Sequence, residues 1–151
     1  MKRLLLVLAL ANGALADDRI QIEQAYRRSH RAMALKYIDG VFSIQSTHYK
    51  LIDPEGVQLD QAVQRGRLEH MLSTALKVEE ESKILTFRHS GKRAHCQVRY
   101  CTRLRRIDAS SQKPMVIQID TVCEDDWSKA GKDWLLDLTK VTHQESHKVK
   151  P

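Results

Sequence analysis

A short strand followed by a tight turn is encoded by the stretch Tyr49-Lys50-Leu51-Ile52-Asp53-Pro54-Glu55-Gly56, which joins two helical patterns and precedes four strand-like runs. Pro54 has no backbone donor and a φ fixed near the value that a turn needs, while Gly56 reaches positive φ at little steric cost. Asp53 therefore lies at the lip of the turn. Its carboxylate either caps the turn by accepting backbone N–H bonds or faces a cavity, and the two alternatives lead to different functions.

The N-terminus has the three parts of an export signal. Lys2 and Arg3 form a basic start, residues 4–11 form an apolar run, and Ala14-Leu15-Ala16 is a small-residue cleavage site. We therefore expect residues 1–16 to be a signal peptide, and the mature protein to be secreted or periplasmic after cleavage following Ala16. The apolar run is far shorter than the roughly 20 residues that span a bilayer, so no stable membrane anchoring is expected. Removal of the segment reduces the chain from 151 to 135 residues and the net charge from +6 to +4, which suits a single domain.

A buried stripe at helical spacing begins after Asp17 and Asp18, either of which is a plausible N-cap. Its members are Ile22, Ala25, Tyr26, Ser29, Met33 and Tyr37, with Arg27, Arg28 and Arg31 on the opposite side. Asp39-Gly40 interrupts this long helix, and residues 41–44 indicate a short second helix. Asp60 is the N-cap candidate of a third helix.

Beyond Glu81 the apolar period changes from 3.6 to 2, which is typical of strands. Strands are expected over residues 83–89, over 93–107, from Pro114 onward and over 133–143. In the third of these, Met115, Ile117, Ile119, Thr121 and Cys123 alternate with Val116, Gln118, Asp120, Val122 and Glu124. The pattern predicts an α+β domain, in which an antiparallel sheet packs against three N-terminal helices, over residues 17–143, with residues 144–151 as a polar tail.

The three cysteines are an odd number for an oxidising compartment. Cys96 and Cys123 share the apolar face if their strands form a hairpin, either directly opposite or one diagonal apart, and Cys101 falls on the other face. A Cys96–Cys123 disulfide and three free thiols are both consistent with this pattern.

The order of these elements, with the turn at residues 52–56 after a helix pair and Trp134 in the last strand, resembles the nuclear-transport-factor-2-like superfamily. The SnoaL-like and ketosteroid-isomerase-like branches are the most similar, and the resemblance covers about residues 19–143. It implies a cone, in which helices pack on a curved antiparallel sheet around a hydrophobic cavity, and a homodimer formed through the sheet. The superfamily includes isomerases, dehydratases and many binding proteins, so the fold does not name a reaction.

The resemblance to the isomerase branch implies Asp53 as a catalytic base and Tyr26 as a hydroxyl donor on the first helix. Asp120 resembles a third group of that branch, but its strand alternation points it away from the core. We expect an exported protein that binds a small, largely apolar molecule between helices and sheet, and the residues expected to bind it are Met33, Phe42, Phe87, Tyr100 and Trp134. One alternative is an isomerase or dehydratase that uses Asp53 and Tyr26. The other is a protein-interaction module whose large side chains fill the cavity.

Other site classes have little support in the sequence. The seven histidines show no HExxH or paired Cys-His spacing, and no glycine-rich phosphate loop is present, so neither a metal nor a cofactor is expected. The modest charge and the lack of arginine-aromatic interleaving also argue against a nucleic-acid partner.

Overall fold

A computed structural model describes the backbone of residues 2–149 and the side chains of residues 17–149. The helices are α1 (Lys2–Ala34), α2 (Ile38–Phe42) and α3 (Gln61–Thr74). The strands are β1 (Gln45–Ile52), β2 (Gln58–Leu59), β3 (Lys77–Ser90), β4 (Arg93–Ile107), β5 (Pro114–Ala130) and β6 (Asp133–Val149). The side chains of the predicted signal peptide and the last two residues of the predicted tail lie outside the described residues.

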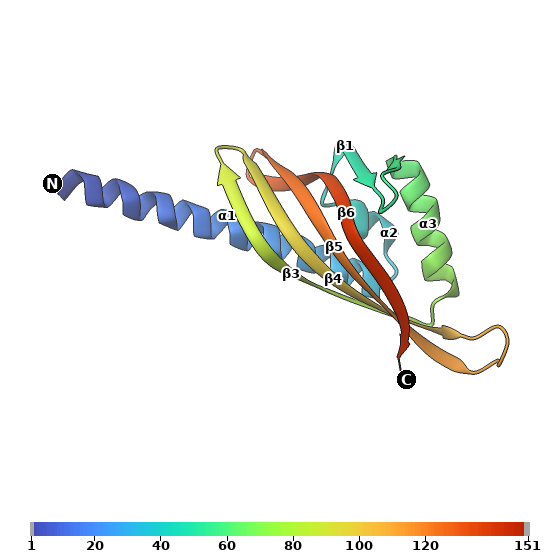
Figure 1. Cartoon of the computed structure of the whole chain (residues 1–151). Coiled ribbons are helices and arrows are strands. Elements are labelled where there is room, and N and C mark those ends of the chain that lie inside the picture. Colours follow the sequence, from blue (N-terminus) through green and yellow to red (C-terminus); the bar gives the residue numbers. More distant parts are fainter. Residues whose placement is uncertain (1, 150–151) are drawn as a thin grey trace.

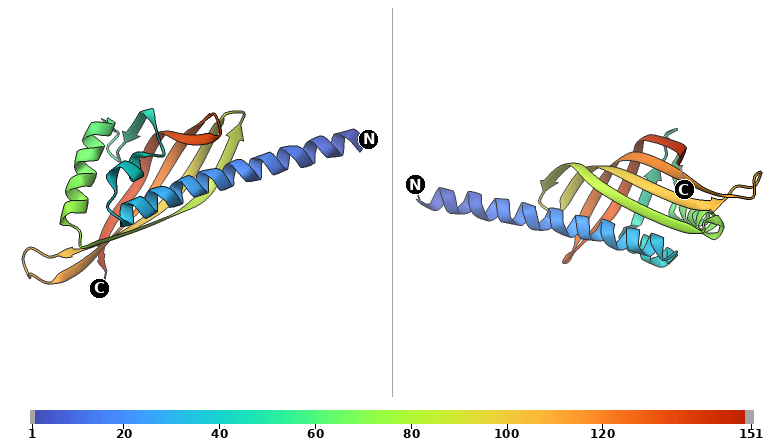
Figure 2. Two further views of the ribbon diagram at one scale, coloured as in Figure 1. Left: turned by 180° about the vertical axis from the view of Figure 1, so that it is seen from behind. Right: turned by 90° about the horizontal axis from the view of Figure 1, so that it is seen from below.

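Helix α1 crosses one face of the sheet, and α2 and α3 lie at one end of that sheet, near β1 and β2 (Figures 1 and 2). The predicted α+β class, with three helices packed on a sheet, is confirmed. The N-terminal part of α1 extends beyond the sheet (Figure 1). Among the described residues, no helix is long and apolar enough to span a membrane.

The sheet has the strand order β2-β1-β6-β5-β4-β3. Strands β3 to β6 form the predicted antiparallel meander. Strand β1 pairs in parallel with β6, so the sheet is mixed at this one pair, whereas the sequence predicted a wholly antiparallel sheet. The direction of β1 is fixed by the short connection from α2, and the Asp-Pro turn returns the chain as β2 on one edge of β1. The other edge of β1 is therefore left to pair with β6.

Three strands are longer than predicted, and the first of them, β1, begins at Gln45 and not at Tyr49. Strand β3 begins at Lys77, and β6 continues to Val149, so the predicted tail from residue 144 contributes to the sheet. Residues 144–149 pair with residues 116–121 of β5, in a part of β6 whose side chains are mostly exposed. This segment is held in the sheet by backbone hydrogen bonds, and its side chains are not buried. Its polar sequence therefore shows no apolar alternation from which a strand could be predicted.

Large side chains occupy the space between α1 and the sheet. Trp127 is 0% exposed and belongs to a cluster of buried residues from α1, from residues 44–49 at and just before the start of β1, and from the meander. The other members are Ile22, Ala25, Tyr26, Ile44, Tyr49, Ile84, Ala94, Cys96, Val98, Trp134 and Leu136. A second cluster joins Met33 of α1 to Leu72 of α3 and Leu104 of β4. Side chains therefore fill much of the region where the resemblance implies a cavity.

Candidate functional site

A buried carboxylate lies at the centre of the domain. Asp125 of β5 is 0% exposed. Its Oδ2 atom accepts hydrogen bonds from the hydroxyl groups of Tyr26 on α1, at 2.6 Å, and of Tyr100 on β4, at 2.7 Å. The indole Nε1 of Trp127 donates to the Tyr26 hydroxyl at 3.1 Å. Three separate elements therefore meet at one carboxylate oxygen.

Burial governs the ionisation of this network. It raises the pKa of Asp125 above its usual value, and the hydrogen bonds from Tyr26 and Tyr100 oppose this shift. Burial and the nearby Asp125 carboxylate also hold the pKa of Tyr26 and of Tyr100 well above the usual tyrosine value. Both phenols therefore stay protonated at ordinary pH and act as donors toward Asp125.

A second polar pair lies next to this network, nearer the surface. His30 is one helical turn after Tyr26 on α1, and its Nε2 lies 3.6 Å from Oε1 of Glu80 on β3. The Oε2 atom of Glu80 accepts a hydrogen bond from the Thr102 hydroxyl at 2.7 Å. The imidazole ring stacks on the Tyr26 ring, with centroids 6.4 Å apart, and meets the edge of the Tyr100 ring at 6.2 Å.

Burial also perturbs both members of this pair. It lowers the pKa of His30 to about 4, so the imidazole is neutral at physiological pH. It raises the pKa of Glu80, while the Thr102 hydrogen bond acts in the opposite direction. Glu80 and a neutral His30 thus face each other without forming an ion pair.

The His30–Glu80 pair lies on the wall of an open cleft of about 510 Å³ between α1 and β3. The side chains of His30 and Glu80 are 12% and 15% exposed, so each remains partly accessible. Tyr26 and Ile84 add apolar surface, and the remaining lining residues are Arg19, Glu23, Arg27, Glu81, Ser82 and Lys83. The cleft therefore combines an apolar wall, charged side chains and one weakly solvated carboxyl group.

Asp53, the predicted base, caps the turn in which it lies. Its Oδ1 accepts hydrogen bonds from the backbone N–H groups of Glu55, at 3.1 Å, and of Val57, at 2.8 Å, and Gly56 has the positive φ of 81° that this turn requires. The hydroxyl of its predicted partner, Tyr26, donates to Asp125 instead. The structure thus shows the turn-capping alternative for Asp53 and places Tyr26 in a different network.

The five predicted ligand-binding residues are distributed over the domain, and none is among those that line the α1–β3 cleft. Tyr100 belongs to the Asp125 network, and Met33 is packed in the second core cluster. Phe42 lies under the Arg65 guanidinium at 5.8 Å, and Phe87 packs on the first cluster. Trp134 is buried, and its Nε1 donates to Asp18 at 3.0 Å.

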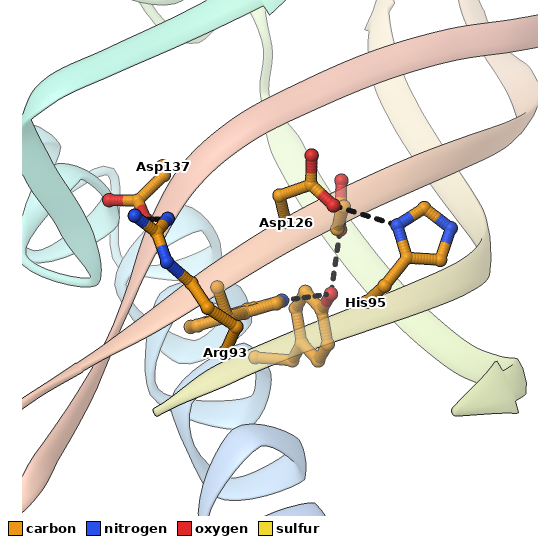
Figure 3. A network of polar contacts seen from close by, with 7 residues as sticks. Arg93, His95, Asp126 and Asp137 are labelled. Atoms are coloured by element: carbon orange, nitrogen blue, oxygen red, sulfur yellow. Dashed lines mark hydrogen bonds and ion pairs between the residues drawn. The ribbon is translucent and has the colours of Figure 1, made fainter. Parts of the chain in front are cut away.

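Further polar pairs lie on the outer face of the sheet, away from α1 (Figure 3). His95 Nδ1 is 2.7 Å from Asp126 Oδ1, and Arg93 Nη1 is 3.2 Å from Asp137 Oδ2. His95 and Asp126 alternate with the buried residues of their strands, so the sheet separates them from the cleft. Exposed pairs of this kind contribute little to stability and do not form part of the cleft.

All three cysteines are free thiols, and Cys96 and Cys123 are one diagonal apart, because Cys123 pairs with Val98. Burial raises the pKa of Cys96 to about 12, and Cys101 is the least buried of the three. We expect iodoacetamide to modify Cys101 first in the folded protein and all three thiols after denaturation, as counted by mass spectrometry. A single adduct after denaturation without reductant would instead show a Cys96–Cys123 disulfide.

Comparison with known proteins identifies the architecture. No protein-family model and no curated protein matches the sequence. Among solved structures, a candidate scytalone dehydratase from Novosphingobium aromaticivorans has a TM-score of 0.74 and 10% identity, covering 93% of each chain. A protein of unknown function with a cystatin-like fold from Nostoc punctiforme has a TM-score of 0.62 and 13% identity, covering 83% of this chain and 90% of its own. A hexachlorocyclohexane dehydrochlorinase, LinA type 2, has a TM-score of 0.63 and 9% identity, covering 87% of this chain and 90% of its own. At these identities the likeness shows the fold and no activity.

Proposed function

We propose that this chain, which has the nuclear-transport-factor-2-like fold predicted from its sequence, binds a small molecule in the cleft between α1 and β3. The observation that carries the proposal is a cleft of about 510 Å³ with a partly accessible carboxyl and imidazole pair in its wall. A concave site with some apolar surface and a few convergent polar groups is the usual form of a small-molecule site.

The lining of the cleft indicates the kind of ligand. Tyr26 and Ile84 offer an apolar surface, whereas His30 and Glu80 offer hydrogen-bonding groups. We therefore propose a ligand with an apolar body and at least one polar group, in place of the largely apolar ligand predicted from the sequence. The lining carries three cationic and three acidic side chains, so it favours neither sign of charge in the polar group of the ligand.

A tryptophan placed in the cleft tests this proposal. Ser82 lines the cleft without belonging to the His30–Glu80 pair, so Ser82→Trp is expected to fill the space and leave the pair intact. With 8-anilinonaphthalene-1-sulfonate, an amphipathic anion, as the probe, we expect its affinity to fall about tenfold, a loss of about 1.4 kcal/mol. Fluorescence titration measures this change.

Thr86→Trp is the matched control, because Thr86 lies on the same strand but is exposed and outside the cleft. This variant should bind the probe as the wild type does. Equal affinity of wild type and Ser82→Trp would contradict the proposal, and would favour the protein-interaction module, in which the filled interior has only a structural role.

We also propose that the protein is exported and cleaved after Ala16. Cleavage there keeps Asp18, whose carboxylate accepts hydrogen bonds from Lys129 and Trp134, in the mature chain. N-terminal sequencing of protein recovered from the periplasm or the medium should begin at Asp17. A sequence beginning at Met1 would contradict the proposal.

Association through the sheet is a further proposal. The outer face of the sheet is not covered by the three helices, as Figure 2 shows, so it is available to a second copy of the chain. Sedimentation analysis of the mature chain should give twice the monomer mass. A monomer at micromolar concentration would contradict the homodimer.

A further inference from the structure

A groove of about 470 Å³ lies on the outer face of the sheet, at the end where β6 finishes and the β4–β5 hairpin extends (Figure 1). It covers two rows of residues that lie opposite one another on neighbouring strands. The first row is Lys77, Arg105, Val116 and Val149, and the second is Glu79, Arg103 and Gln118. These residues alternate with Val78 and Leu104, which are buried against the helices, so the sheet separates the groove from the α1–β3 cleft.

The first row places two positive charges together. Lys77 and Arg105 are directly opposite each other on β3 and β4, a position in which like charges repel. The Lys77 ammonium is directed to Glu79, with Nζ 2.5 Å from Oε1. Arg105 is exposed and forms no ion pair within the described residues 17–149. The guanidinium of Arg105 is therefore a cation without a counter-charge from the chain.

The second row does not neutralise this charge. The Nε of Arg103 donates to Oε1 of Gln118 at 3.1 Å, and that amide is uncharged. The hydrogen bond and charge of Lys77, with a smaller contribution from Arg103, lower the pKa of Glu79, so this carboxyl group is ionised at neutral pH. Three cations and one carboxylate leave the lining with a net charge of +2. The groove therefore favours an anion.

An apolar surface lies beside the cations. Val116 and Val149 are half-buried and directly opposite each other, and Val116 is also directly opposite Arg105. Arg103 and Arg105 are two positions apart on one strand, roughly 7 Å, and a guanidinium binds carboxylate or phosphate oxygens through paired N–H groups. The row beyond the groove contains the acidic residues Glu81 and Asp120. A bound anionic group is therefore expected at the Arg105 end.

From this arrangement we propose that the outer-face groove is a second ligand site, which binds a small molecule that carries a phosphate or carboxylate group on an apolar body. Arg105 and Lys77 bind the anionic group, and the apolar body lies on Val116 and Val149. This site is independent of the α1–β3 cleft and involves no reaction. It uses only the last two rows of the outer face, and leaves the rows before Cys101 free for the second copy of the chain proposed above.

Isothermal titration calorimetry of the mature chain with 1-naphthyl phosphate tests this proposal. We expect this ester to bind at least tenfold more tightly than inorganic phosphate, because only the ester has an apolar body to place on Val116 and Val149. The affinity should fall as sodium chloride is added, since salt screens exposed charges. Val116→Thr keeps the shape of the side chain, and it should weaken the binding of the ester about threefold without changing that of inorganic phosphate.

Arg105→Gln is expected to lower the affinity for 1-naphthyl phosphate about tenfold. Arg105 is exposed, so the variant should fold, and its thermal unfolding curve verifies this. Arg99→Gln is the matched control: Arg99 is exposed on the same face of β4, lies outside the groove, and its replacement changes the net charge by the same amount. Both this variant and Ser82→Trp should bind the ester as the wild type does.

Three results would overturn the inference. Equal losses in Arg105→Gln and Arg99→Gln would show attraction to the net charge and no specific site. A loss in Ser82→Trp, with full affinity in Arg105→Gln, would place the ester in the α1–β3 cleft and so support the proposed function alone. If the wild type does not bind the ester and Arg105→Gln dissociates the homodimer, the basic row belongs to the interface between two copies. The cleft and the groove therefore fail in different experiments.

Discussion

Replacement of Asp125 by alanine is expected to lower the free energy of unfolding by about 2 to 5 kcal/mol. The hydroxyls of Tyr26 and Tyr100 would lose their shared acceptor while remaining buried, and each unsatisfied group costs roughly 1 to 3 kcal/mol. Urea denaturation followed by tryptophan fluorescence measures the change, with Trp127 in contact with Tyr26 as a local reporter. A loss below about 1 kcal/mol would show that the two hydroxyls find other partners.

Asp125→Asn separates the hydrogen bonds from the charge. The pKa of Asp125 is raised in the folded protein, so between its unfolded and folded pKa values the folded state binds more protons than the unfolded state does. The contribution of Asp125 to stability therefore decreases as the pH rises through this interval. An asparagine does not titrate, so the stability of wild type relative to Asp125→Asn should decrease from acidic toward neutral pH.

The other titrating groups of the two proteins are the same, and their effects largely cancel in this difference. Unfolding curves collected for both proteins from about pH 4 upward, near the ordinary aspartate pKa, measure it directly. A difference that does not vary with pH would mean that Asp125 keeps the same charge in the folded and unfolded states.

The alternation of side chains predicted much of the inward surface. It placed Cys96 on the apolar face of β4, and Cys96 is buried there. In β5 the same alternation, continued two and four residues beyond Cys123, reaches Asp125 and Trp127, which are both fully buried. The signal for the Asp125 network was therefore present in the sequence. From sequence alone, an aspartate on an apolar face indicates that the strand has ended. The opposite interpretation requires knowing which tyrosine hydroxyls donate to its carboxylate.

Two features of the interior depend on tertiary arrangement and have no local signal. The register of β6 shifts at two points against β5, and one shift brings Thr139 inward, whereas simple alternation from Leu136 predicts Leu138. The contact between His30 and Glu80 joins residues 50 positions apart, and it depends on how α1 lies across β3. The apolar periodicity of a single segment predicts neither the position of a β-bulge nor the place where a helix crosses a strand.

At Asp53, in contrast, the local sequence pattern is explained by local structure alone. Asp-Pro-x-Gly is a turn sequence, and the Asp53 carboxylate satisfies the N–H groups of Glu55 and Val57 in that turn. The resemblance to the isomerase branch made a catalytic role an alternative. The structure instead places partly accessible acid–base groups at His30 and Glu80, on the side of the domain where α1 meets β3.

Trp134→Ala is expected to reduce the free energy of unfolding by about 3 to 5 kcal/mol, the usual cost of removing a large buried aromatic side chain. Trp134 is 3% exposed, and its ring meets the His89 ring at 5.7 Å and the Lys129 ammonium at 5.4 Å. Its Nε1 shares the Asp18 carboxylate with the Lys129 ammonium, which lies 2.6 Å from Oδ1. Removing the indole would thus weaken the attachment of α1 to the sheet as well as the core.

Trp134→Phe is the control for the second effect, because it keeps a buried aromatic ring while it removes the donor to Asp18 together with the smaller ring of the indole. We expect it to cost about 1.5 to 3 kcal/mol, the range for a hydrogen bond to a charged group. In Trp134→Ala, amide hydrogen exchange should accelerate most in the first turns of α1 after Asp18, where the contact to the sheet is lost. Uniform acceleration over β4 and β5 as well would show that the indole supports the whole core, and that Asp18 has no separate role in holding the helix.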